Sequence, residues 1–157
     1  LFLVHRLPCW SANLGQRLVK APKLHLTDTG LVCHLLGAGV ARLTADPPLL
    51  GRILETFVVG ELRKQASFGD LRVDVHHFRT ATGAEVDVVL EAFDGRVAAV
   101  EVKASATVGP SDFNAMRSLQ GRLGGRLCGG VLLHLGEATV AFGDRLWVAP
   151  VSALWSA

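Results

Sequence analysis

The sequence predicts an α/β protein in which helices flank a mixed sheet. Residues 47–69 carry the longest helical pattern of the chain, and three strand patterns follow between residues 71 and 103. A second helical pattern at residues 110–123 then precedes a short apolar run, "GGVLLHLG", that reads as a buried strand. The order helix, three strands, helix, strand is typical of a sheet covered by helices.

Composition is that of a globular protein with a core. The chain has 157 residues, of which 50% are hydrophobic and 19% are charged. These values exclude a disordered chain and allow one domain, alone or with a small appendage. The formal net charge of +2 neither requires nor excludes a nucleic-acid partner.

The cysteines favour a reducing compartment. Cys9, Cys33 and Cys128 are odd in number, lie far apart and form no C-x-x-C pair. A disulfide framework is therefore not expected, and we predict a cytoplasmic protein. No apolar run reaches the length of about 18 residues that a membrane helix needs, so no membrane partner is expected.

Residues 1–46 are expected to be a linker with a short strand and a short helix, from the end of a preceding module. The strand is "KLHL", and Asp28 and Thr29 are the expected N-cap of a helix that ends at Gly37. The chain begins with leucine and has one methionine, Met116, so we expect a piece of a longer protein. Lys23 and its neighbouring basic residues are read as solvated linker charges. The oligomeric state is not predicted.

Residues 47–157 are expected to form the main domain. Two prolines at positions 47 and 48 open its first helix, which closes near Gly69. At about 100° per residue, apolar side chains form one stripe of this helix. Glu55 lies at the edge of the stripe and Glu61 inside it. Each needs a partner; Glu55 either reaches the sheet or reaches solvent or an arginine.

The remaining elements follow from turn residues and caps. A strand is predicted at residues 71–80 with a turn at 81–83, and a helix at 110–123 capped by Ser111. A C-terminal hairpin at residues 138–150 is predicted to turn at Gly143-Asp144.

Residues 83–105 form a predicted hairpin with an unusual set of charges. Glu85, Asp87, Glu101 and Lys103 lie among valines, where core side chains are expected. Strict alternation puts Glu85 and Asp87 on one face of the first strand, with the intervening valine on the other. Glu101 and Lys103 likewise share a face of the second strand.

The length of the turn decides whether the two charged faces coincide. A two-residue loop at 94–95 sets Asp87 against Val102. A three-residue loop at 93–95, with its glycine left-handed, sets Asp87 opposite Glu101 and Glu85 opposite Lys103. The glycine at the third position favours the three-residue loop.

Opposed carboxylates have two readings. Their β-carbons would lie about 5 Å apart, where like charges repel. The repulsion is tolerable if water screens it, if one carboxylate is protonated, or if a divalent cation lies between Asp87 and Glu101. The hairpin is therefore either solvated, with its charges paired at the surface, or part of a cation site. Charge pattern alone leaves both readings open.

The ordered set "GRILE", "EVD" and "EVK" resembles the PD-(D/E)XK nuclease superfamily. More closely, "KAPKLHLTDTGLVCHLLG", "GRILETFVVGELRKQ", "HHFRTATGAEVDVVLE" and "AVEVKAS" resemble the C-terminal domain of unknown function of a prokaryotic AAA-type ATPase family. The resemblance covers nearly the whole chain. It implies a restriction-endonuclease-like αβββαβ core with a C-terminal hairpin.

The resemblance also implies a chemistry, Mg²⁺-dependent (or Mn²⁺-dependent) phosphodiester hydrolysis on DNA. Asp87 and Glu101 would bind the metal, Glu55 would assist, and the Val102 carbonyl could be a further ligand. Lys103 would orient the attacking water and stabilise the phosphate.

Secondary candidates for the site are Glu85, Glu61 and Arg79. Arg79 is either a phosphate contact or an ordinary exposed arginine of the strand. ATP is expected only in an N-terminal ATPase module outside this chain, because no G-x-x-x-x-G-K-[ST] motif occurs here. The alternative function is a catalytically inactive module that binds a partner or regulates the ATPase.

Histidine and cysteine sites are less favoured. His76 and His77 are neighbours in a strand and point to opposite faces, so they cannot serve one metal together. The Cys33-His34 pair has no second pair at zinc spacing.

Overall fold

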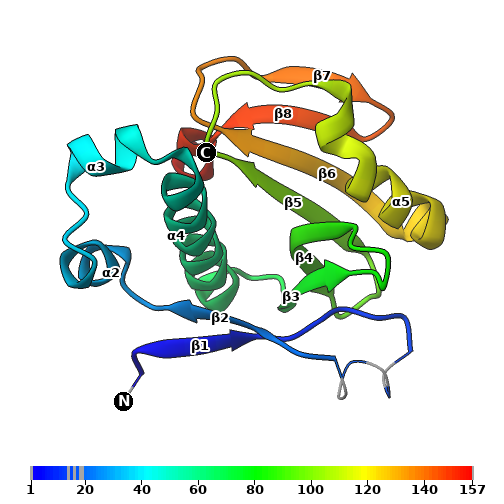
Figure 1. Cartoon of the computed structure of the whole chain (residues 1–157). Coiled ribbons are helices and arrows are strands. Elements are labelled where there is room, and N and C mark those ends of the chain that lie inside the picture. The colour runs from blue at the N-terminus through cyan, green and yellow to red at the C-terminus, as the bar shows by residue number, and fades with distance from the viewer. Residues whose placement is uncertain (1, 14, 16, 18–19, 157) are drawn as a thin grey trace.

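The computed structural model describes residues 2–13, 15, 17 and 20–156. Its centre is a six-stranded sheet with strand order β3-β4-β5-β6-β8-β7, flanked by helices (Figure 1). Strands β3, β4 and β5 are antiparallel neighbours, whereas β6 runs parallel to both β5 and β8. The predicted α/β class with a mixed sheet is therefore confirmed. None of the helices within the described residues is long and apolar enough to cross a membrane.

The main sheet consists of β3 (Val73–Arg79), β4 (Glu85–Ala92), β5 (Val97–Lys103), β6 (Leu127–His134), β7 (Val140–Gly143) and β8 (Leu146–Pro150). The helices are α2 (Thr29–Leu35), α3 (Val40–Ala45), α4 (Pro47–Phe68) and α5 (Asn114–Leu123). Short 3₁₀ turns η1 (Pro110–Phe113), η2 (Gly124–Arg126) and η3 (Val151–Trp155) complete this part of the chain.

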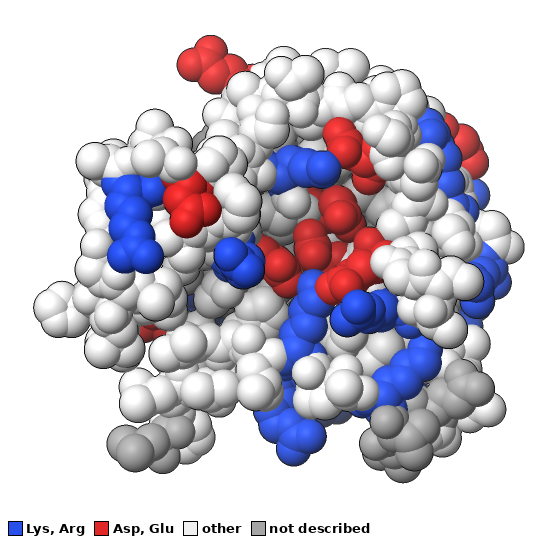
Figure 2. Space-filling view, viewed as in Figure 1, with Lys and Arg blue, Asp and Glu red and all other residues white. Residues whose placement is uncertain are grey.

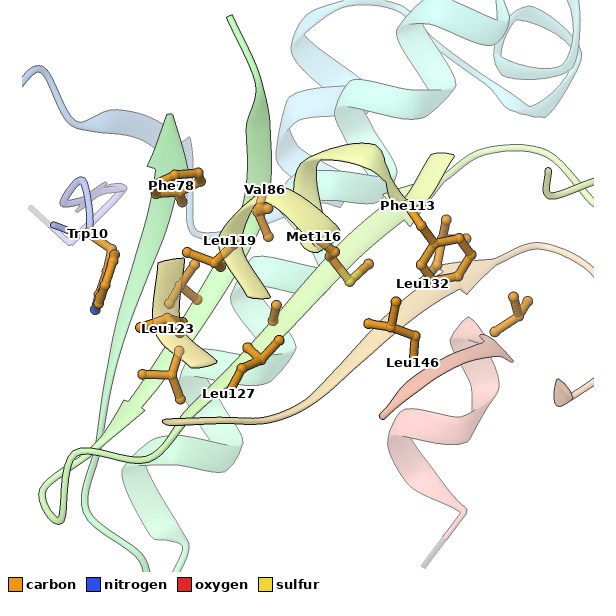
Figure 3. Close-up of a cluster of buried hydrophobic side chains, with 14 residues drawn as sticks. Trp10, Phe78, Val86, Phe113, Met116, Leu119, Leu123, Leu127, Leu132 and Leu146 are labelled. Atoms are coloured by element: carbon orange, nitrogen blue, oxygen red, sulfur yellow. The ribbon is translucent and has the colours of Figure 1, made fainter. Parts of the chain in front are cut away.

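Each face of the sheet carries its own apolar core. Val100 and Leu133 pack with Leu54, Val58 and other residues of α4. The alternate residues of the same strands, among them Ala99 and Leu132, pack with α5 through Met116, Leu119 and Leu123 (Figure 3). Because strand side chains alternate, α4 and α5 cover opposite faces.

Helix α4 begins and ends as its sequence predicts. Asp46 accepts a hydrogen bond from the Leu49 amide at 3.0 Å, and prolines occupy the first two helical positions. The helix closes at Gly69, whose amide donates to the Gln65 carbonyl at 2.9 Å. This long helix crosses one face of the sheet and presents Glu55 to the end of β4 that carries Asp87.

The turn between β4 and β5 has three residues, as the glycine position predicts. The Ala92 amide donates to the Arg96 carbonyl at 2.8 Å, and Gly95 has φ 85°. The ladder then runs from Glu91 opposite Val97 to Val88 opposite Val100. Continued by one residue, this register places Asp87 beside Glu101.

A two-stranded ribbon, β1 (Val4–Leu7) with β2 (Lys23–Leu26), packs below the main sheet (Figure 1). The chain after β1 pairs with β3, since the Trp10 amide donates to the His77 carbonyl and the His77 amide donates to the Pro8 carbonyl. Asp28 caps α2 by accepting from the Leu31 amide at 2.8 Å. The predicted "KLHL" strand and its helix cap are thus confirmed.

Two predicted caps and turns differ in the structure. Ser111 is not an N-cap, because the chain first forms η1, where the Asp112 carboxylate accepts from the Gly109 amide at 2.9 Å. The C-terminal hairpin turns one residue later than predicted, at Asp144 and Arg145, and Arg145 takes φ 57°. The proline before Ser111 starts the 3₁₀ turn earlier than the serine would.

Candidate functional site

Four carboxylates from three elements gather at one end of β4 and β5. Glu55 comes from α4, Glu85 and Asp87 from β4, and Glu101 from β5. Figure 2 shows acidic side chains in a hollow near the centre of this face, with basic side chains at its rim. The site is therefore built where the long helix meets the end of the β4–β5 ladder.

Lys23 lies in the middle of this cluster. Its Nζ is 2.7 Å from Glu55 Oε1 and 3.2 Å from Asp87 Oδ1, and it also pairs with Glu85 Oε1. Burial alone would lower the pKa of the Lys23 ammonium, but Asp87 and Glu55 together raise it. Lys23 therefore stays charged and neutralises part of the acidic cluster.

Asp87 is held from two sides. Oδ1 contacts Lys23, and Oδ2 accepts a hydrogen bond from the Val102 amide at 3.0 Å. Burial, followed by the charge of Glu55, raises the pKa of Asp87, while Lys23 and the Val102 amide oppose that rise. The Asp87 carboxylate thus lies beside the backbone of β5.

A β-bulge sets the position of Asp87. His76 of β3 pairs with Val89 of β4, and Phe78 pairs with Val86. Between these pairs, two residues of β4, Asp87 and Val88, lie opposite one residue of β3, His77. The strict alternation expected from the sequence is wrong here, because Val86 packs on the α5 side and Val88 on the α4 side. The bulge turns Asp87 toward α4 and Lys23.

Glu101 is the least compensated carboxyl group of the cluster. Its Oε2 is buried and has no hydrogen-bond partner in the described part of the chain. Burial, and then the charge of Asp87, raise the pKa of Glu101 to about 8. The backbone amide of Asp87, Lys23 and Lys103 oppose this rise only in part. A proton or a cation at Glu101 would relieve the repulsion.

Lys103 lies near Glu101 but pairs elsewhere. Its Nζ is 2.7 Å from Asp112 Oδ1 of η1, and 41% of its side-chain area is exposed. Among the groups that lower the pKa of Glu101, the Lys103 charge has the smallest effect. The structure therefore places Lys103 at the rim of the cluster.

The remaining predicted residues are spread around the site. Arg79 Nε lies 3.6 Å from Glu85 Oε2, and the side chain is 64% exposed. Val102 touches the site through its amide, which donates to Asp87. Glu61 is not in the cluster, because it pairs with Lys64 one turn further along α4.

The histidines near the site, His25, His76 and His77, have lowered pKa values and are enclosed by the protein. His25 is buried next to Lys23, and burial followed by the Lys23 charge lowers its pKa to about 4. Its Nδ1 lies 3.2 Å from the Thr56 hydroxyl. Burial also lowers the pKa of His76 and His77.

Oxygen ligands for a hard cation are present, but the geometry is not that of a closed site. Within the described residues, no three His, Cys, Asp or Glu side chains are arranged to hold a metal ion. The buried, unpartnered Glu101 Oε2 beside Asp87 nevertheless fits a cation that prefers carboxylate oxygens. The ammonium of Lys23 occupies the other oxygens that such a cation would use.

Sequence reasoning missed Lys23, although the strand carries a signal. In β2 the alternation is inverted: Leu24 is 67% exposed, whereas His25 is 5% exposed. Lys23 and His25 share the inward face by the same alternation. A four-residue strand with leucines outward and basic side chains inward indicates polar partners on the main body.

Comparison with known families decides the classification. A family model described as "Domain of unknown function (DUF4143)" matches residues 50–154. The chain belongs to this family. A second model, "Domain of unknown function (DUF8612)", matches residues 1–42. The carboxylates of the cluster thus lie in the DUF4143 domain, whereas Lys23 comes from the segment before it.

Relatives of this DUF4143 protein include an uncharacterized protein of Mycobacterium tuberculosis and one of Mycobacterium bovis. Each is 34% identical over 116 residues, which is 74% of this chain. The match covers 25% of each relative, so the chain spans about a quarter of their length. No solved structure matches the chain.

Proposed function

We propose that this DUF4143 domain has a restriction-endonuclease-like core and is a nuclease-like module that hydrolyses phosphodiester bonds of DNA with Mg²⁺ or Mn²⁺. The observation that carries the proposal is the half-buried pair of Asp87 and Glu101, in which one buried oxygen of Glu101 has no partner among the described residues. Buried carboxyl groups with raised pKa values are typical of sites that do chemistry or bind ions.

The donors fit a hard divalent cation. Asp87 and Glu101 would hold it, with Glu55 assisting and the Val102 carbonyl as a further ligand. Such a cation supplies a polarised phosphate and an activated water near neutral pH. The protein contributes two adjacent acids, fixed by the three-residue turn and by the Val102 amide.

The rim of the site fits an anionic polymer. Lys103 and Arg79 are both exposed at the edge of the cluster, and Lys20 binds the Arg79 carbonyl at 3.2 Å. In Figure 2 basic side chains surround the acidic hollow. Cationic groups around an acidic centre attract phosphates at the rim while the centre takes the cation.

In the wider protein, the partner of this module is expected to be an ATP-binding module of the AAA type. The relatives are about four times as long as the matched segment, which leaves room for such a module in them. Hydrolysis of ATP there would act on the nuclease-like domain through the segment that precedes it.

Cleavage of fluorescence-quenched DNA in Mg²⁺ or Mn²⁺ tests the proposal. We expect the wild type to cleave DNA and the cleavage rate to fall about 100-fold or more in Asp87→Asn and Glu101→Gln. The control variant Asp74→Asn should cleave at the wild-type rate. Asp74 is a matched control, because it is exposed on the neighbouring strand β3. Equal activity of Asp87→Asn and wild type would contradict the site.

A second candidate function is a catalytically inactive module that binds a partner or regulates the ATPase. The contacts of Lys23 with Glu55, Glu85 and Asp87 favour it, because an ion-paired cluster can be purely structural. Absence of Mn²⁺ heat in titration calorimetry, together with absence of cleavage, would support this second function.

A further inference from the structure

The lysine in closest contact with the carboxylates comes from β2 and not from β5. Lys23 Nζ touches one oxygen each of Glu55, Glu85 and Asp87. Its side chain is 21% exposed, so most of it is enclosed by the ribbon, α4 and β4. Among the described residues, no other lysine pairs with more than one carboxylate.

Lys103 is committed to a different partner. Its ammonium pairs with Asp112 of η1, on the α5 side of the sheet, and it is twice as exposed as Lys23. Asp112 in turn accepts from the Gly109 amide, which fixes the acid in place. Lys103 would have to leave this pair in order to reach the oxygens of Asp87.

The oxygens that Lys23 contacts are those that a divalent cation would need. Glu55 Oε1 at 2.7 Å and Asp87 Oδ1 at 3.2 Å both contact the Lys23 ammonium, and the charge of Asp87 acts on Glu101. Two cations bound to the same oxygens repel each other strongly in a half-buried site. An ammonium and a metal ion therefore exclude each other at Asp87 Oδ1.

We infer that Lys23 is the lysine of this site and that it exchanges with the divalent cation. Without the cation, Lys23 neutralises Glu55, Glu85 and Asp87. When the cation binds, the ammonium gives up Asp87 and swings on its flexible four-carbon stem to the adjacent phosphate. The inference rests on the proposed function for its catalytic half, whereas the exchange itself concerns only the cluster.

The position of Lys23 in the chain suits such an exchange. It is the first residue of β2, and a proline precedes it. Its ribbon belongs to the segment matched by a different family model from the one that covers the acids. The acids and the lysine of the cluster thus come from two separately matched segments of the chain.

Titration calorimetry with Mn²⁺ tests the exchange. We expect Lys23→Met to bind Mn²⁺ about tenfold more tightly than the wild type, because the competing charge is gone and the chain length is kept. Lys103→Met, the matched control on β5, should change the affinity by less than about twofold, and Lys23→Arg should stay close to the wild type. Circular dichroism confirms that each variant is folded. Unchanged or weaker Mn²⁺ binding by folded Lys23→Met overturns the inference.

DNA cleavage by the same variants tests the catalytic half. Lys23→Met should bind Mn²⁺ more tightly yet cleave at least about tenfold more slowly, a pair of opposite changes that a merely structural role does not produce. Cleavage by Lys23→Met at the wild-type rate overturns the role at the phosphate. Tighter Mn²⁺ binding with no cleavage by any protein, wild type included, supports the exchange and refutes the proposed hydrolysis.

Discussion

Glu101 carries the largest electrostatic cost that the structure shows for a carboxyl group of the site. Its raised pKa of about 8 means that it holds a proton in the folded chain at neutral pH, unless a cation replaces that proton. The pKa of Asp87 is raised as well, by burial and by Glu55, but Lys23 and the Val102 amide oppose that rise. The two adjacent acids thus differ in how far their neighbours compensate them.

Glu101→Gln should stabilise the metal-free protein at high pH. The folded pKa lies above the ordinary value of 4.5, so the folded wild type binds more protons between these values and loses stability as pH rises toward 8. Glutamine has no such loss. Urea denaturation in chelator should therefore show the variant and the wild type close together at pH 5, and the variant more stable at pH 9.

The exposed Glu137→Gln is the control for this change and should not alter the pH profile. A parallel decline of Glu101→Gln and wild type between pH 5 and 9 would mean that Glu101 is ionised at neutral pH without a cation.

At this scale the sequence predicts Asp87 and Glu101 but not Lys23. The acids lie 14 residues apart in one hairpin, and a glycine in the turn determines their register. Lys23 reaches Asp87 across 64 residues of chain. No local pattern determines such a long-range contact. The inverted alternation of β2 indicates only that the Lys23 side chain points toward the main body of the protein.

The β4–β5 turn is the element that aligns the site. Gly95 at φ 85° lets three residues close the loop, and the ladder that follows brings β5 alongside β4 up to Val88 opposite Val100. A shift of one residue would send every side chain of β5 to the other face. The site therefore depends on the backbone of this glycine.

Gly95→Ala should destabilise the fold by about 1–2 kcal/mol, because an L-residue is strained at positive φ. Gly121→Ala is the matched control. Gly121 lies in α5, where an added Cβ meets nothing within 4 Å, so alanine should stabilise by about 0.5–1 kcal/mol. Urea denaturation of both variants measures the two changes, and equal signs would contradict the assignment of the turn.

Among the elements, local signals predict the ends best. Asp46 and the prolines fix the start of α4, and Gly95 fixes the hairpin. The bulge at Asp87 could not be predicted, because it arises from pairing with β3 and not from any residue of β4 alone. The Ser111 cap was wrong because the preceding proline starts a 3₁₀ turn first.

Across the whole molecule, Glu91 ties three distant parts of the chain together. It accepts from Arg17 at 2.6 and 3.2 Å and from Arg126 at 3.1 Å. Arg17 belongs to the connection between β1 and β2, and Arg126 to η2. The ribbon that delivers Lys23 is therefore anchored at a second point, at the opposite end of β4.

Glu91→Gln should destabilise the protein at pH 7 by about 1 kcal/mol, a value discounted for the solvent exposure of the Arg126 side chain. Burial alone would raise the pKa of Glu91, but Arg17 lowers it below the ordinary value of 4.5. The stabilisation is thus present above pH 4.5 and is lost as pH falls through the lower folded value. Thermal unfolding should show a large difference at pH 7 and a small one at pH 3.

Asp144→Asn is the control at this scale, because the Asp144 side chain is exposed at the tip of the C-terminal hairpin, where it pairs with its sequence neighbour Arg145 and accepts a long hydrogen bond of 3.5 Å from Gln120. It should change the melting temperature little at either pH. A similar effect of both variants would refute an anchoring role for Glu91.

The bridge between Cys9 and His77 has a consequence for association. It occupies the outer N–H and C=O groups of His77 in β3, so a strand from another molecule could pair along the whole of β3 only by displacing the chain at Pro8–Trp10. The other margin is β7, only four residues long and ending in a glycine. One edge strand of the sheet is thus interrupted at His77 and the other is short, and both features disfavour edge-to-edge pairing of sheets into fibres.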